Sequence, residues 1–129
     1  MKNVLKLFTL LGFMAVLTGS AAADYHVGKF RHVVMFKFKE DVTADQIKNI
    51  EVEFGKLPDK IDTIIGYEWG TSETVEEGLD QGYTHCFLLT FKDKAGLEVY
   101  LPHPDHKAFV EIIKPLLAEV HVFDYTVKE

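Results

Sequence analysis

The chain has 129 residues, with 20 Asp or Glu against 14 Lys or Arg, so its formal net charge is -6. Nucleic acid binding is excluded as a function, because phosphate contacts need clustered Lys and Arg side chains and the chain contains no such run. The single Cys rules out an intramolecular disulfide framework and any metal or redox site of the CxxC type. With 47% hydrophobic residues, the chain can bury the core of one domain.

The first 23 residues have the pattern of a secretory signal peptide. Lys2 and Lys6 accompany the start of an apolar run over residues 5–17, and small residues that include Ala21 and Ala23 follow it. This run is shorter than the roughly 20 apolar residues that a membrane-spanning helix needs, so we expect cleavage and not a membrane anchor. The predicted organisation is a signal peptide at 1–23 and one periplasmic or secreted domain at 24–129, with no membrane contact after cleavage.

The first half of this domain predicts two strands with a helix between them. Apolar and aromatic residues alternate over 30–39, which is typical of a strand whose helix-facing side carries Phe30, His32, Val34, Phe36 and Phe38. Thr43 and Gln46 have the spacing of a capping box, and the helix that follows, with Phe54 on its apolar face, should end near Pro58. A second strand is expected over 63–71, with Ile65, Tyr67 and Trp69 on one side.

The second half repeats this pattern after an acidic loop at 72–82. A strand is predicted over 83–92, and because both of its faces are apolar in the middle it should be central in the sheet. A short helix at 94–101, a helix that begins at Pro104 and a last strand at 120–127 complete the domain.

The resulting order, β-α-β-β-α-β, is that of an α+β, ferredoxin-like subunit, a four-stranded antiparallel sheet with helices on one face. The second face of such a sheet would be uncovered and apolar, with Val33, Met35, Ile64, Cys86, Leu88, Phe123 and Tyr125 on it. We therefore expect a homodimer in which two copies pair through these faces, with Cys86 as a small apolar interface residue.

Histidine residues are the main candidates for a functional site. His32 and His85 fall on the helix-facing side of their strands, where they are either hydrogen-bonded core residues or the lining of a pocket. A metal site at His103 and His106 is not favoured, because no third ligand is evident. Asp124 is expected to pair with His106 and to support it as a general base.

Four segments resemble the stress-responsive A/B barrel (Dabb) domain family, and the resemblance extends over about residues 30–127. They are His32-Val-Val-Met-Phe-Lys-Phe-Lys39, Gly82-Tyr-Thr-His85 with the strand after it, Tyr100-Leu-Pro-His-Pro-Asp-His106 and Phe123-Asp-Tyr125. The resemblance implies a dimeric α+β barrel. By analogy with a plant polyketide cyclase of this family, it also implies that His106 abstracts a proton, Asp124 orients His106 and Tyr100 stabilises the enolate, without metal or cofactor.

Three functions remain open at this level. The first is binding of a small apolar or aromatic ligand between sheet and helices, in a site lined by His32, Val34, Phe36, Phe54, His85 and Phe87. The second is a cofactor-independent cyclase or isomerase that uses His106, and the third is a purely structural stress protein.

Overall fold

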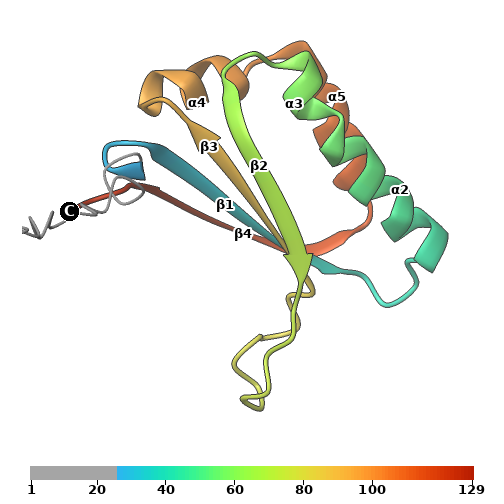
Figure 1. Ribbon diagram of the computed structural model, residues 1–129. Coiled ribbons are helices and arrows are strands. Elements are labelled where there is room, and N and C mark those ends of the chain that lie inside the picture. The colour runs from blue at the N-terminus through green and yellow to red at the C-terminus, as the bar shows by residue number, and fades with distance from the viewer. Residues whose placement is uncertain (1–25) are drawn as a thin grey trace, which may run out of the picture.

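The computed structural model describes residues 26–129, and the predicted signal peptide lies outside them. Four antiparallel strands form one sheet in the order β2-β3-β1-β4, and the helices lie on one of its faces (Figure 1). The strands are β1 (Phe30–Phe38), β2 (Ile64–Thr71), β3 (His85–Phe91) and β4 (Leu117–Thr126). The helices are α2 (Ala44–Gly55), α3 (Leu57–Lys60), α4 (Lys94–Tyr100) and α5 (Pro104–Ile113). The predicted α+β, ferredoxin-like class is confirmed.

Helix α2 begins as the sequence predicts but ends earlier. The Oγ1 atom of Thr43 accepts a hydrogen bond from the backbone N–H of Gln46 at 3.2 Å, and the Gln46 side chain accepts one from the N–H of Thr43 at 2.9 Å. The sequence predicts one helix that ends near Pro58, but the structure has two. Pro58 lies in the first turn of α3, where a backbone N–H has no partner within the helix, so proline is tolerated there.

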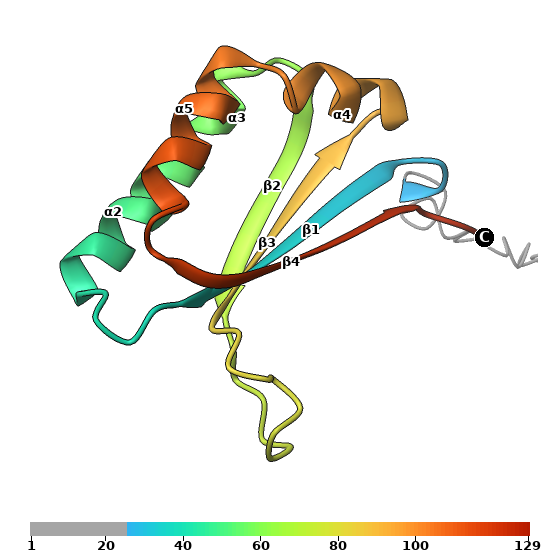
Figure 2. The same ribbon diagram turned by 180° about the vertical axis from the view of Figure 1, so that it is seen from behind.

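The core fills the space between the sheet and helices α2 and α5, which lie side by side across it (Figures 1 and 2). Phe36, Phe54 and Phe87 are at most 1% exposed, and each buried aromatic side chain of this kind contributes roughly 1.5–3 kcal/mol. The alternation expected for 30–39 is confirmed, since the buried residues of β1 are every second one from Phe30 to Phe36.

Strand β2 departs from the predicted alternation at its start. The register of β2 against β3 shifts between Ile64 and Gly66, so one extra residue is present on β2. Ile64 consequently belongs to the core with 7% exposure, whereas Ile65, predicted on the core side, is 52% exposed. Two strand starts also differ from the prediction, as β3 begins at His85 and β4 at Leu117.

The sheet face without helices carries exposed apolar side chains. Phe123 is 59% and Tyr125 39% exposed, and Val33 and Leu88 are only partly buried. Cys86 is an exposed free thiol within the single chain. Ile64, which we expected on this face, points to the core because of the bulge. No helix within residues 26–129 is long and apolar enough to cross a bilayer.

Candidate functional site

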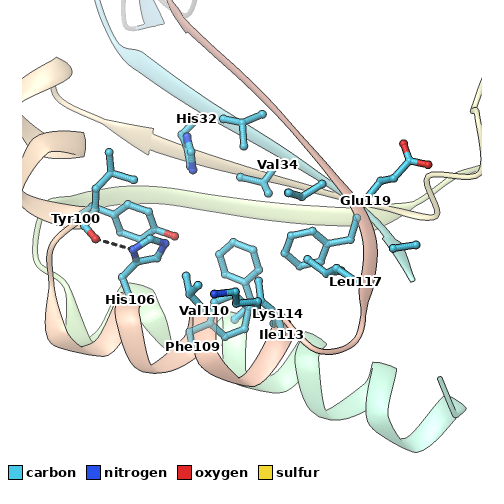
Figure 3. Close-up of a pocket in the computed structure, with 16 residues that line it drawn as sticks. His32, Val34, Tyr100, His106, Phe109, Val110, Ile113, Lys114, Leu117 and Glu119 are labelled. Carbon is cyan, nitrogen blue, oxygen red and sulfur yellow. Dashed lines mark hydrogen bonds between the residues drawn. The ribbon is translucent and has the colours of Figure 1, made fainter. Parts of the chain in front are cut away.

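A pocket of about 500 Å³ opens between helix α5 and strands β1 and β4 (Figure 3). Helices α2 and α5 lie on the same face of the sheet as this pocket, and β4, the edge strand, has little helix above it (Figure 2). Val120 and Val122 of β4 face this pocket and remain 52% and 47% exposed. Most of the lining is apolar, and it includes Val34, Phe36 and Phe54 of the predicted set.

Three polar side chains meet at one end of this pocket, namely His32, Tyr100 and His106 (Figure 3). The ring centroids of Tyr100 and His106 are 4.2 Å apart, and those of His32 and Tyr100 are 5.7 Å apart. They come from three elements, β1, the end of α4 and the first turn of α5, so the tertiary fold assembles them. The sequence placed Tyr100 and His106 close together through the turn, and His32, predicted to line a pocket, lies beside them.

His106 is held with one ring nitrogen available to the pocket. Its Nδ1 atom lies 2.9 Å from the carbonyl oxygen of Leu101, an acceptor, so Nδ1 carries the proton and donates it. Nε2 of the neutral ring then carries a lone pair, and it makes no hydrogen bond within residues 26–129. Burial lowers the pKa of His106 below its ordinary value of 6.5, so the neutral form predominates at pH 7. A neutral imidazole with a free Nε2 can accept a proton or a hydrogen bond.

Tyr100 presents a hydroxyl that stays protonated. The side chain is 1% exposed, and burial raises the pKa of its phenol well above the ordinary value of 10.0. Its hydroxyl makes no hydrogen bond to any of the described residues, although the ring packs against Phe91 and His106. A neutral phenol at the end of an apolar pocket can donate a hydrogen bond to a carbonyl or hydroxyl oxygen of a ligand.

Asp124 pairs with His32, whereas the sequence predicted a pair with His106. The distance from His32 Nδ1 to Asp124 Oδ1 is 2.6 Å. The two residues are direct partners in the antiparallel register of β1 and β4, on the helix-facing side. The His32 side chain is 7% exposed, so this contact satisfies a buried nitrogen. Asp124 therefore orients His32, and the support for His106 comes from the Leu101 carbonyl.

His85 and Phe87, both predicted as ligand-binding residues, do not line this pocket. His85 Nε2 lies 3.3 Å from Glu51 Oε1, its Nδ1 lies 2.9 Å from Thr84 Oγ1, and its ring stacks on Trp69. It is a core histidine with satisfied nitrogens. Phe87 is completely buried behind Phe54, with ring centroids 4.3 Å apart. Because α2 covers β2 and β3, side chains on this part of the sheet are shut off from the pocket.

Several lining residues were not predicted as ligand-binding. They are Leu101, Phe109, Val110, Ile113, Lys114, Leu117, Ala118, Glu119, Val120 and Val122. The apolar residues of α5 and β4 can be read in the sequence, but their periodicity does not distinguish a pocket wall from core packing. Residues 26–129 hold no cluster of three or more His, Cys, Asp or Glu side chains that could bind a metal.

The chain is similar to proteins of one family over most of its length. The family model described as the stress responsive A/B barrel domain matches residues 30–127. A stress-response A/B barrel domain-containing protein of Arabidopsis thaliana is 35% identical over 99 residues, which are 76% of this chain and 86% of the relative. Olivetolic acid cyclase of Cannabis sativa is 27% identical over 96 residues, or 74% of this chain and 94% of the enzyme.

Solved structures share this fold. A crystal structure from Arabidopsis thaliana superposes with a TM-score of 0.73 at 32% identity, covering 78% of this chain and 96% of that one. A dimeric ferredoxin-like protein of unknown function from Thermobifida fusca superposes with a TM-score of 0.67 at 27% identity, covering 77% and 91% of the two chains. The chain thus belongs to the stress-responsive A/B barrel (Dabb) domain family.

Proposed function

We propose that this protein is an exported homodimer that binds a small apolar or aromatic molecule with one polar end. The observation that carries the proposal is the open, mostly apolar pocket of about 500 Å³ with His32, Tyr100 and His106 at one end. This volume lies within the range of roughly 300–1,000 Å³ that is usual for ligand pockets. The apolar walls would take the body of the ligand, and the Tyr100 hydroxyl and His106 Nε2 would bind its oxygen atom.

Homodimerisation is supported by the helix-free face of the sheet. The exposed aromatic side chains of Phe123 and Tyr125 and the partly buried Val33 and Leu88 form an apolar patch that is unusual for a monomer. The Thermobifida fusca relative is described as dimeric. Sedimentation at micromolar concentration should give twice the chain mass, and replacing Phe123 by Lys should give a monomer.

Export is supported by the sequence of residues 1–23 alone. Expression of the full chain in a Gram-negative host should place it in the periplasm, with a mature N-terminus at Asp24. An intact Met1 in purified protein, or retention in the cytoplasm, would reject this part of the proposal.

Ligand binding is tested by blocking the pocket. Calorimetric titration with 2-naphthol, an apolar aromatic with one hydroxyl, should give saturable binding to the native protein. Val122→Phe places a larger ring in the pocket from a half-exposed position and should abolish this binding. Val99→Phe is the matched control, since Val99 is 51% exposed on α4 and does not line the pocket.

The same titration separates the ligand-binding protein from a purely structural one. Absence of binding to the native protein, together with no small molecule in native mass spectra of protein from its own source, would favour the structural function. If both Val→Phe variants bind the probe equally well, the binding site is not this pocket.

A second candidate function is cofactor-independent proton transfer. The observation that favours it is the His106 ring, neutral at pH 7, with Nε2 free and the Tyr100 ring 4.2 Å away. Nε2 would remove a proton next to a ligand carbonyl, and the neutral Tyr100 hydroxyl would donate a hydrogen bond to the enolate oxygen. The 27% identical relative with the name olivetolic acid cyclase supports this chemistry by analogy.

Proton transfer has a test that binding alone does not satisfy. In D2O, the protein should exchange the methyl hydrogens of acetophenone faster than buffer does, as followed by NMR. His106→Gln removes the base and should return the rate to that of buffer. Exchange that persists at the native rate in His106→Gln would reject His106 as the base.

A further inference from the structure

A second pocket, of about 490 Å³, lies on the sheet face without helices, near the end where β3 begins. Its floor includes Met35, Cys86 and His121, and its walls come from the loop between β2 and β3. This loop extends beyond the ends of the strands (Figure 1). The pocket is separate from the candidate site above, which lies on the other face of the sheet.

The three floor residues form one row across three strands. Met35 of the central strand β1 is the direct register partner of Cys86 on β3 and also of His121 on β4. Directly opposed residues in an antiparallel pair point to the same face, with Cβ atoms about 4.5–5.5 Å apart. The row therefore places a thioether, a thiol and an imidazole next to one another over one pocket.

The composition of this row is unusual for the chain. Cys86 is the one Cys of the whole sequence, and Met35 is the one Met among residues 26–129. In the neighbouring row of the same face, Val33 is paired with Leu88 and Phe123, as an ordinary apolar contact surface would require. Sulfur and nitrogen donors thus coincide at the row that lines a pocket and are absent from the row beside it.

The donor atoms are available to a ligand. The Cys86 thiol is free and is exposed in the single chain. The ring nitrogens of His121 make no hydrogen bond within the described part of the chain, and the ring has an edge contact with Tyr83 at 6.2 Å between centroids. His85 also lines this pocket, but its nitrogens are already bound to Glu51 and Thr84.

We propose that Met35, Cys86 and His121 form a binding site for Cu(I). Thiolate and thioether sulfur atoms are soft ligands that select Cu(I), and imidazole is a common copper ligand. Harder divalent ions such as Mg²⁺ and Ca²⁺ need oxygen ligands, and the row has none. Binding forms a Cu–S bond and releases the thiol proton to water, with no change of oxidation state.

The site is compatible with the proposed dimer. The row lies near one end of the sheet and under the loop, whereas the apolar row of Val33, Leu88 and Phe123 lies further along the same face. A second copy can cover that apolar row while the loop shields the metal.

The test is anaerobic titration of the full reduced protein with Cu(I) in competition with bicinchoninate, whose copper complex is coloured. The native protein should take one Cu(I) per chain from the chelator. Cys86→Ser should lower the affinity by at least about 100-fold, and Met35→Leu and His121→Gln each by about 10-fold or more, because each removes one ligand. His103→Asn is the control, since it removes an imidazole outside the row and Asn can still cap α5.

Three results would overturn the proposal. One is that the native protein takes no copper from bicinchoninate. Another is that Met35→Leu and His121→Gln bind as the native protein does, which would mean that the thiol alone binds the ion. The last is one copper per two chains, which would mean that two Cys86 thiolates share it. X-ray absorption of the native copper complex should show two sulfur atoms and one nitrogen, and this result does not depend on the folding of any variant.

Discussion

Two tyrosine hydroxyls without protein partners allow the pocket to be tested by a matched pair of substitutions. The hydroxyl of Tyr67 is buried and has no hydrogen-bond partner among the described residues, and Tyr67 does not line the pocket beside α5. The hydroxyl of Tyr100 also makes no hydrogen bond within residues 26–129, but Tyr100 lines that pocket. Tyr100→Phe therefore removes a hydroxyl from a residue of the candidate site, and Tyr67→Phe removes the same group from a residue outside it.

The magnitudes follow from the surroundings of each hydroxyl. Burial of an unpaired hydroxyl costs about 1–3 kcal/mol, so Tyr67→Phe should raise the free energy of unfolding by about 1 kcal/mol. Tyr100→Phe should change it by less than about 1 kcal/mol, because its hydroxyl borders open pocket space. If the Tyr100 hydroxyl donates to a ligand, its removal costs one hydrogen bond of about 0.5–1.5 kcal/mol, which is about 2- to 12-fold in affinity.

The assays are urea denaturation followed by circular dichroism, and calorimetric titration with 2-naphthol. Tyr100→Phe should bind the probe more weakly with little change in stability, whereas Tyr67→Phe should be more stable with unchanged affinity. A loss of more than 2 kcal/mol of stability in Tyr100→Phe would show that its hydroxyl has a structural partner. Equal affinities of the native protein and Tyr100→Phe would refute the role of this hydroxyl in the pocket.

Three further predictions concern pH and packing. Burial raises the pKa of Tyr67 to about 12. The free energy of unfolding should therefore decrease by up to about 2 kcal/mol as pH rises from 10 to 12. In urea denaturation, Tyr67→Phe should not show this decrease. Burial lowers the pKa of His106, so as pH falls the unfolded chain is protonated at this residue before the folded chain is. The free energy of unfolding should therefore decrease as pH drops below about 6.5. The same decrease in His106→Gln as in the native protein would contradict this assignment. Phe54 is 1% exposed and packs on Phe87 and Phe109. Phe54→Ala should therefore lower the free energy of unfolding, measured by urea denaturation, by about 3–5 kcal/mol. A loss below about 1 kcal/mol would show that the core collapses around the cavity.

Local patterns in the sequence were sufficient to predict most elements of the fold. The alternation in 30–39 identified the buried side of β1, and the Thr43 capping box located the start of α2, because both depend on residues close together in the chain. The order of strands and helices was sufficient to predict the ferredoxin-like class. The bulge at Ile64 was not predicted, because β2 accommodates its extra residue only through its pairing with β3.

The candidate site was predicted in its residue types but not in its pairings. By itself the sequence determined that Tyr100 and His106 lie near one another, because one short turn joins their helices. Tertiary structure decided that Asp124 bonds to His32, since that contact depends on the register of two strands about 90 residues apart in the chain. It also decided that His85 and Phe87 do not line the pocket beside α5, because α2 packs over β2 and β3 and this pocket lies beside β1 and β4. Sequence periodicity tells which face of a strand is turned inward, whereas the packing of helices on that face decides which inward side chains border a pocket.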